Sequence, residues 1–282
     1  MKPSLPPPTD STVLSDMVYG LGASALPTFF LLLVVLCWTV TGLWGFCLHY
    51  WVPRLRSSWP PVLFLALHLI FGFALVVVAA GVFAALAQGL GDGGVVATLD
   101  EVFTGAVRQN TAPLTLQAFA LVSKFGDTAT LIMLGMAVSL WLALVNRLWL
   151  VLPWLAALLG NWLLNGILKN IFERARPLHA QGLADAPGWS FPSGHASGTV
   201  VVYGMLAYLL LRVMPRHWVQ RAGLPVLLAA VAIAFGTACS RVFLQVHYAS
   251  DVMAGAASGL AWLLVCICST ELTRHYHQSR KA

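Results

Sequence analysis

Charged residues are scarce in this sequence. Asp, Glu, Lys and Arg make up only 9% of its 282 residues, whereas about a quarter of the residues in a soluble domain are charged. Hydrophobic residues account for 59% and form several uninterrupted runs longer than the roughly 18 residues that indicate a membrane span. This composition argues against a large soluble protein with buried helices and predicts a polytopic α-helical membrane protein.

The sequence also has few cysteines and no recognisable signal peptide. The five cysteines include no CxxC pair and are odd in number, which argues against a disulfide framework or a cysteine metal site. The opening stretch, MKPSLPPPTDST, lacks the basic start and adjoining apolar core of a signal peptide. Because it is polar and rich in proline, we expect it to be disordered or extended.

The apolar runs predict an all-α fold, a membrane helix bundle of about six or seven transmembrane helices. Residues 13–26 could extend the first run or form a surface helix. Two stretches with helical spacing, within 99–109 and 115–127, predict amphipathic helices at the outer face. The seven runs cover approximately residues 27–49, 61–87, 128–146, 149–170, 195–213, 224–241 and 252–270.

The basic residues predict the orientation of the chain. Alternate connections are rich in Arg and Lys, whereas the others hold nearly all the acidic residues. Because cytoplasmic loops carry the excess of Lys and Arg, the C-terminus should lie in the cytoplasm and the N-terminus outside. The basic set comprises Arg54, Arg56, Arg147, Arg212, Arg216, Arg221, Arg274, Arg280 and Lys281.

Three polar clusters fall at the predicted outer ends of spans: KNIFERARP (169–177), FPSGHASG (191–198) and SRVFLQVHYASD (240–251). Charged side chains near hydrocarbon are seldom found without partners or a function. Lys169, Arg176 and Arg241 are cations suited to binding a multiply charged oxyanion. Ser193 and Gly194 stand at a predicted helix start, where free backbone N–H groups favour an anion.

The histidines of these clusters suit acid–base and nucleophilic chemistry. His247 and Asp251 are four residues apart, so on a helix the carboxylate can hold one imidazole nitrogen and leave the other as a nucleophile or base. His195, on another span, could protonate a leaving group. Together with the cations, this set favours phosphoryl transfer without a metal or other cofactor. A metal site built from His195, His247 and Asp251 is a weaker alternative, because three nearby cations would repel a divalent ion.

These motifs resemble the type-2 phosphatidic acid phosphatases, or lipid phosphate phosphatase superfamily. The family pattern is Lys, six residues, Arg-Pro; then Pro-Ser-Gly-His; then Ser-Arg, five residues, His, three residues, Asp. The sequence matches at Lys169 to Pro177, Pro192 to His195 and Ser240 to Asp251. Many bacterial members have six spans, so the predicted seventh span near the N-terminus is a departure.

The resemblance implies a role for each matched residue. His247 would be the nucleophile, Asp251 its orienting partner and His195 the general acid. The phosphate-binding set would be Lys169, Arg176, Ser193, Gly194 and Arg241. It also implies a metal-independent hydrolase of membrane lipid phosphates, with undecaprenyl pyrophosphate, phosphatidylglycerophosphate and phosphatidate as candidate substrates. The enzyme would be a multi-pass protein of the bacterial inner membrane, with its site on the periplasmic or outer face.

We accordingly divide the chain into four parts. They are a polar, Pro-rich N-terminal tail (1–26), a two-span region (27–98), a lipid phosphatase domain (99–270) and a basic cytoplasmic C-terminal tail (271–282). The expected partners are the lipid substrate and the bilayer, and no nucleic acid. The sequence leaves open the lipid, the choice between one phosphate and two, the role of the extra span and the oligomeric state.

Two other functions fit parts of this pattern. A phosphotransferase could pass the phosphoryl group from the same intermediate to a lipid acceptor such as lipid A. A non-catalytic protein that binds or transports a lipid phosphate is disfavoured, because both His247 and Asp251 are present. We interpret Arg174 as a surface residue, with a fourth phosphate contact as the alternative. Trp189 and Phe191 are interpreted as interface anchors, and His179 and the remaining histidines as structural or spectator residues.

Overall fold

A computed structural model describes residues 10–51, 61–90, 94–177 and 187–279. Within these ranges the chain is helical, and it contains no strand. The α-helices are α1 (Asp10–Ala23), α2 (Ala25–Phe46), α4 (Pro61–Gln88), α5 (Val95–Asn110), α6 (Pro113–Ser123), α7 (Thr128–Leu144), α8 (Val151–Phe172), α9 (Gly194–Val213), α10 (Arg216–Phe243) and α11 (Ala249–Ser279). There are also three one-turn helices: Cys47–Trp51 after α2, Lys124–Gly126 between α6 and α7, and Leu148–Leu150 between α7 and α8.

The membrane bundle agrees with the prediction of six or seven spans. In the part of the chain that the structure describes, six helical stretches are long and apolar enough to cross a membrane: Ala25–His49, Leu69–Gln88, Leu148–Phe172, Gly194–Val213, Arg216–Phe243 and Ala249–Tyr276. The predicted span at 128–146 is different, because α7 has only 17 residues. Together with Pro113–Gly126 it forms one apolar pair that is bent by 43°.

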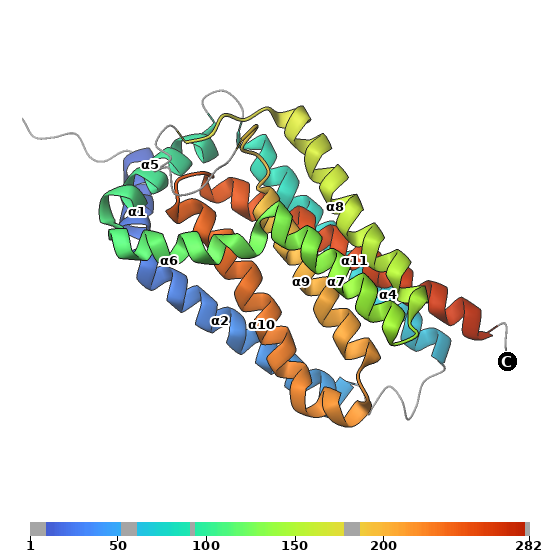
Figure 1. Cartoon of the computed structure of the whole chain (residues 1–282). Coiled ribbons are helices and arrows are strands. Elements are labelled where there is room, and N and C mark those ends of the chain that lie inside the picture. Colours follow the sequence, from blue (N-terminus) through green and yellow to red (C-terminus); the bar gives the residue numbers. More distant parts are fainter. Residues whose placement is uncertain (1–9, 52–60, 91–93, 178–186, 280–282) are drawn as a thin grey trace, which may run out of the picture.

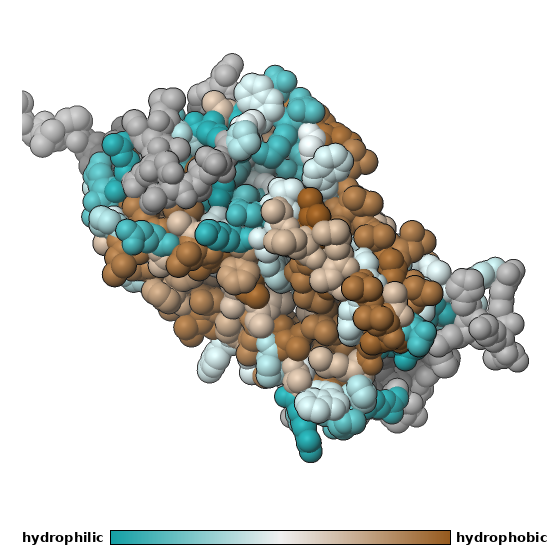
Figure 2. Space-filling view, in the orientation of Figure 1, coloured by the Kyte–Doolittle hydropathy of each residue, from teal (hydrophilic) through white to brown (hydrophobic). Residues whose placement is uncertain are grey.

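The surface of the bundle supports this assignment. Figure 2 shows a broad hydrophobic band across the middle of the molecule, with hydrophilic side chains gathered toward its ends. Large apolar side chains of the membrane helices are open to the surroundings, including Trp38 of α2 at 82% exposure and Leu152 of α8 at 77%. Exposed apolar surfaces of this kind are stable in hydrocarbon, because no apolar group there is in contact with water.

Helix α9 is the centre of the bundle and contacts α8, α10 and α11. Its core layer includes the buried side chains of Trp154, Met205 and Leu209. Small residues let α11 approach closely, because a side chain at Gly255 or Gly259 would collide with the backbone at the start of α9. This close approach brings the beginning of α9 beside the beginning of α11, where two of the three polar clusters lie.

The N-terminal helices pack on the outside of this centre. Helix α2 lies along α10, and α4 lies along α11 (Figure 1). Phe29 of α2 contacts the rings of Phe119, Phe235 and Phe243, which fastens α2 to α6 and α10. The two-span region therefore packs directly on the predicted phosphatase domain.

Helix α1 is separate from the first span and packs against α5. A side chain at Gly22 would meet the backbone of Phe103, so the two helices are in close contact. The expected extended conformation is therefore wrong for residues 10–12, which begin α1; residues 1–9 lie outside the described part. At the other end, α11 continues to Ser279, so most of the predicted C-terminal tail is helical.

Helices are present at both predicted positions, as α5 and α6. The amphipathic prediction is wrong for α6, because its exposed face is also apolar, with Leu114 at 77% and Leu121 at 64% exposure. Both helices lie together with α1 at one end of the bundle (Figure 1). Helix α6 runs across α10 and leads through the turn Lys124–Gly126 into α7. This end of the bundle also carries the candidate active site.

Candidate active site

The three polar clusters converge on one cavity of about 1180 Å³. Its lining includes Lys169 near the end of α8, Arg176 just after α8, His195 in α9, Arg241 in α10 and His247 just before α11. Segments up to 78 residues apart are thus brought together by the packing of α8, α10 and α11 around α9. Gly194 also lines the cavity, whereas Ser193 and Asp251 are buried behind it, with exposures of 0%.

His247 has one ring nitrogen toward the cavity and the other toward a carboxylate. Its Nε2 lies 3.0 Å from Nη1 of Arg176. Its Nδ1 lies 3.4 Å from Oδ2 of Asp251 and 3.3 Å from Oγ of Ser190. Since Arg176 can only donate, this arrangement fits an imidazole protonated on Nδ1 with a lone pair on Nε2.

Burial keeps His247 neutral. Loss of hydration lowers the pKa of His247 from 6.5 to about 3, against the opposing effect of its hydrogen bond to Asp251. The side chain is therefore uncharged at neutral pH, and its free nitrogen lies next to a guanidinium group. A neutral, oriented imidazole beside a cation is the state that a histidine nucleophile requires.

Asp251 is held by several donors. Ser190 donates its hydroxyl to Oδ2, and the backbone N–H of Tyr248 donates to the same oxygen at 2.9 Å. The carbonyl of Asp251 accepts from the backbone N–H of Ser193 at 2.9 Å. These bonds tie the PSGH segment to the start of α11 and fix the carboxylate behind the imidazole.

The cations of the site rest on backbone carbonyls. Arg176 donates to the carbonyl oxygens of Gly188 at 2.9 Å, Trp189 at 3.1 Å and Val246 at 2.7 Å. Lys169 donates to the carbonyl oxygen of Trp189. Because carbonyl oxygens are neutral acceptors, these contacts hold the cations in place and leave their charge available to an anion.

Arg241 is buried at 2% exposure and donates from Nη1 to Oγ of Ser123 at 2.5 Å. Its Nε has no hydrogen-bond partner among the described residues. A buried guanidinium N–H without a partner is costly, and a phosphate oxygen in the cavity would remove that cost. Ser123 of α6 was not predicted as part of the site, since nothing in the sequence links it to a position 118 residues away.

Ser193 begins α9 and caps it. Its Oγ accepts from the backbone N–H of Ala196 at 3.5 Å, and hydroxyl caps of this kind stabilise helix N-termini. In this structure its hydroxyl therefore serves the helix. The adjoining Gly194 lines the cavity at the N-terminal end of α9, where the helix dipole favours an anion.

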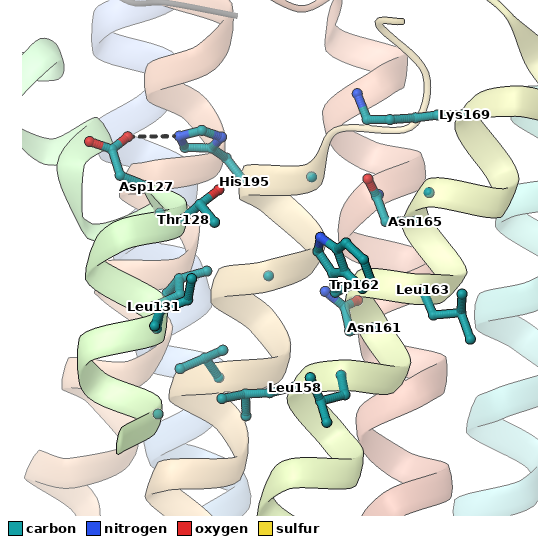
Figure 3. Close-up of a pocket in the computed structure, with 18 of the residues that line it drawn as sticks. Asp127, Thr128, Leu131, Leu158, Asn161, Trp162, Leu163, Asn165, Lys169 and His195 are labelled. Carbon is teal, nitrogen blue, oxygen red and sulfur yellow. Dashed lines mark hydrogen bonds and ion pairs between the residues drawn. The ribbon is translucent and has the colours of Figure 1, made fainter. Parts of the chain in front are cut away.

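His195 forms a second imidazole–carboxylate pair. Its Nε2 lies 3.1 Å from Oδ1 of Asp127, the residue before α7. Figure 3 shows this contact and places the rest of the ring toward the side of the cavity that carries Lys169. Asp127 was not among the predicted site residues, because an acid at the start of a span is typical of a surface position.

The interpretation of Arg174 as a surface residue is wrong. Its guanidinium group pairs with Asp251 at 2.6 Å and with Asp100 of α5 at 2.8 Å, and it lies 4.1 Å from the ring centre of Tyr248. Although burial opposes its charge, these carboxylates raise the pKa of Arg174 above its usual value. Arg174 therefore joins the amphipathic helix α5 to the carboxylate behind His247.

The interpretation of Phe191 as an interface anchor is also wrong. Phe191 is fully buried and packs against the rings of Phe83 and Phe172. Trp189 is 40% exposed, as expected of an anchor. His179 lies outside the described residues. Among those that are described, no three His, Cys, Asp or Glu side chains are grouped so that they could hold a metal ion.

A helical membrane bundle with this cationic, histidine-bearing cavity defines a membrane-embedded phosphatase. A sequence model of the PAP2 superfamily matches residues 149–274. Phosphatidylglycerophosphatase B of Bacillus subtilis (strain 168) is 30% identical over 165 residues, which cover 58% of this chain and 80% of that protein. The chain belongs to the PAP2 superfamily and is a lipid phosphatase of that group.

A solved structure supports the same assignment. The chain is similar to the crystal structure of a transmembrane PAP2 type phosphatidylglycerolphosphate phosphatase from Bacillus subtilis, with a TM-score of 0.63 and 28% identity. The similarity covers 68% of this chain and 93% of that one. The resemblance inferred from the three motifs is thereby confirmed.

Proposed function

We propose that this protein hydrolyses a phosphomonoester or pyrophosphate of a membrane lipid through a phosphohistidine on His247. The observation that carries the proposal is the placement of His247, with Nε2 3.0 Å from Arg176 in the cavity and Nδ1 backed by Asp251. The lipid in the names of the Bacillus subtilis relative and of the solved structure makes phosphatidylglycerophosphate the first substrate to test. Phosphatidate and undecaprenyl pyrophosphate are the other candidates.

In the first step, Nε2 of His247 attacks phosphorus while the bond to the leaving oxygen breaks. Lys169, Arg176, Arg241 and the N-terminal end of α9 at Gly194 would stabilise the negative charge on the three remaining oxygens. Asp251 stabilises the imidazole as it becomes positively charged. The negative charge of a bound phosphate, added to that of Asp127, would favour the protonated form of His195. His195 then gives its proton to the leaving oxygen, so the product departs as a neutral alcohol or a protonated phosphate.

In the second step, water cleaves the phosphohistidine. His195, now neutral, takes a proton from the attacking water. The N–P bond breaks, inorganic phosphate leaves and His247 returns to its neutral form. Positive charge from the three side chains is sufficient for this scheme, so no metal step is included.

The basic loops support a site at the outer face of a bacterial inner membrane, with the C-terminus in the cytoplasm. The lipid tail would remain in the apolar part of the cavity while the phosphate occupies its cationic end. A phosphotransferase that uses the same intermediate would differ only in its acceptor.

The test is phosphate release by the purified full-length protein from the three lipids, with and without chelator or vanadate. We expect release to survive the chelator and to be inhibited by vanadate, which mimics pentacoordinate phosphorus. We expect His247→Ala to be inactive and wild type to form an acid-labile phosphoprotein. Retained activity in His247→Ala, or activity restored by a divalent ion after chelation, would overturn the mechanism.

A further inference from the structure

The cavity extends well beyond the phosphate-binding end. Its lining runs along α8 from Lys169 to Leu155, which is about 21 Å at the usual helical rise. The far part is apolar: Leu131 of α7 faces Leu158 of α8 (Figure 3), and Met136 of α7 also lines the cavity. The cavity therefore has room for a hydrocarbon chain as well as a phosphate.

Two amide side chains stand between these polar and apolar ends. Asn165 and Asn161 line the cavity and precede Lys169 by four and eight residues. Residues four apart share one face of a helix, so the three side chains form a line that descends about 6 Å per step. Figure 3 shows them along the cavity side of α8.

The upper amide adjoins the phosphate-binding end. Asn165 donates from Nδ2 to Oγ of Ser197 at 3.3 Å, which fixes its orientation. Its Oδ1 lies so close to α9 that a Cβ at Gly194 would be 3.1 Å away. The Asn165 carbonyl is thus presented beside the helix start where the phosphate would bind.

The lower amide has unused hydrogen-bonding capacity. Asn161 is buried, at 7% exposure, and no hydrogen bond joins its side chain to another described residue. Leu131 and Leu158 line the same stretch of the cavity. The amide opens onto the cavity, since its atoms are not among the enclosed unpaired polar atoms of the described residues. Hydrocarbon packed against it would leave it unpaired at a cost of about 1–3 kcal/mol, so a ligand with polar atoms at this depth would be favoured.

We propose that Asn165 and Asn161 bind the polar linker between the phosphate and the acyl chains, and that they make the enzyme selective for glycerophospholipid phosphates. This inference rests on the proposed function and adds the class of substrate. A glycerol linker carries hydroxyl or ester oxygens within the first few atoms after the phosphate. The two amides would hydrogen-bond to these oxygens.

A polyprenyl phosphate has different chemistry at the same depth. Its hydrocarbon chain begins at the first carbon after the phosphate ester, so it has no group with which either amide can bond. Binding would then leave both amides in contact with hydrocarbon. Sites built to hydrogen-bond a substrate discriminate strongly against analogues that lack the bonding group, because the site's own polar groups remain unpaired.

The experiment compares matched monophosphates in the same mixed micelles. We would measure kcat/KM for phosphatidate and for a polyprenyl phosphate with wild type, Asn165→Leu and Asn161→Leu, which keep the number and branching of the side-chain heavy atoms. Gln117→Leu is the control, since Gln117 is an exposed amide on α6 outside the cavity lining. The quantity compared is the ratio of the two constants, in which any general loss of activity cancels.

We expect wild type to favour phosphatidate by at least about tenfold, and each cavity variant to lower that ratio by about three- to tenfold. Gln117→Leu should leave the ratio unchanged. An unchanged ratio in both cavity variants would overturn the inference. If the variants do not fold, wild type decides alone, because similar constants for the two lipids would also overturn it.

Hydrolysis of p-nitrophenyl phosphate separates this inference from the proposed function. It requires the phosphate site but neither linker nor acyl chain. Wild-type protein that cleaves neither it nor any lipid phosphate would contradict the proposed function itself. Wild-type protein that cleaves it and both lipids equally well would leave the function intact and refute the role of the amides.

Discussion

Nε2 of His195 lies 3.1 Å from Oδ1 of Asp127, and this pair repeats the imidazole–carboxylate arrangement of His247 and Asp251 within one cavity. The two pairs differ in exposure. The Asp251 side chain is fully buried, whereas that of Asp127 is 49% exposed. A buried carboxylate suits a fixed nucleophile, whereas a solvated one can support a group that exchanges protons with water.

The first prediction concerns Asp127 as a positioning residue for His195, the proposed general acid. Asp127→Asn should lower kcat for phosphatidate about tenfold, because the carboxylate both orients His195 and favours its protonated form. The loss for p-nitrophenyl phosphate should be much smaller, since nitrophenolate leaves without a proton. Parallel kinetics on the two substrates check this.

A purely structural role for Asp127 predicts a different result. Both substrates would then lose activity to the same degree, and that outcome would contradict the assignment. Lys124→Gln is a suitable control, because Lys124 also lines the cavity but forms no hydrogen bond or ion pair with His195 among the described residues.

The second prediction concerns Ser190, which is fully buried and bridges Nδ1 of His247 and Oδ2 of Asp251. Ser190→Ala should lower kcat about tenfold with little change in KM, because the loss of both hydroxyl contacts loosens the proposed nucleophile and leaves the cations of the cavity in place. Ser139→Ala is the matched control, since the Ser139 hydroxyl bonds within its own helix at Gly135. A rise in KM with unchanged kcat would assign Ser190 to substrate binding.

The third prediction concerns the ion pairs of Arg174. Arg174→Met should destabilise the protein by about 3–5 kcal/mol, because it leaves the buried carboxylates of Asp100 and Asp251 without their cation. Activity should fall as well, since one of these carboxylates supports His247. Thermal unfolding in detergent, together with phosphate release, measures both effects.

A surface ion pair provides the control for Arg174. Arg274 pairs with Glu271 at 3.0 Å, and both side chains are about one third exposed. Arg274→Met should therefore cost at most about 1 kcal/mol. Equal destabilisation by the two substitutions would contradict the structural role given to Arg174.

Features that depend on neighbouring residues, such as spans and motifs, could be predicted from the sequence. Contacts between residues far apart in the chain could not. Apolar runs marked the spans, and motif spacing marked His247, His195 and the three cations. Arg174 was misread because a charge at the end of a span usually faces water. Its partners Asp100 and Asp251 are 74 and 77 residues away, and only the packing of α5 and α11 brings them together.

The bend between α6 and α7 could not be predicted for a related reason. Residues 113–144 are apolar enough for a span, yet hydropathy does not register a change of direction. The turn at Lys124–Gly126 fits closely against α9 and α10, because a side chain at Gly126 would collide with His195 and Thr237. Tertiary contacts therefore determine the bend, and with it the position of Asp127.

The last prediction concerns pH and the neutral state of His247. Its pKa is lowered by burial from 6.5 to about 3, so the unfolded chain binds more protons than the folded one between these values. The contribution of His247 to the free energy of unfolding is thus fully present above pH 6.5 and is lost as the pH falls toward 3. At pH 5 the loss should be on the order of 2 kcal/mol.

His247→Gln, which cannot titrate, should show a correspondingly smaller drop in melting temperature between pH 7 and pH 5, measured in the same detergent. Identical drops in wild type and variant would show that the imidazole is not buried in its neutral form, and would remove the basis for assigning it as a nucleophile that remains unprotonated in mild acid.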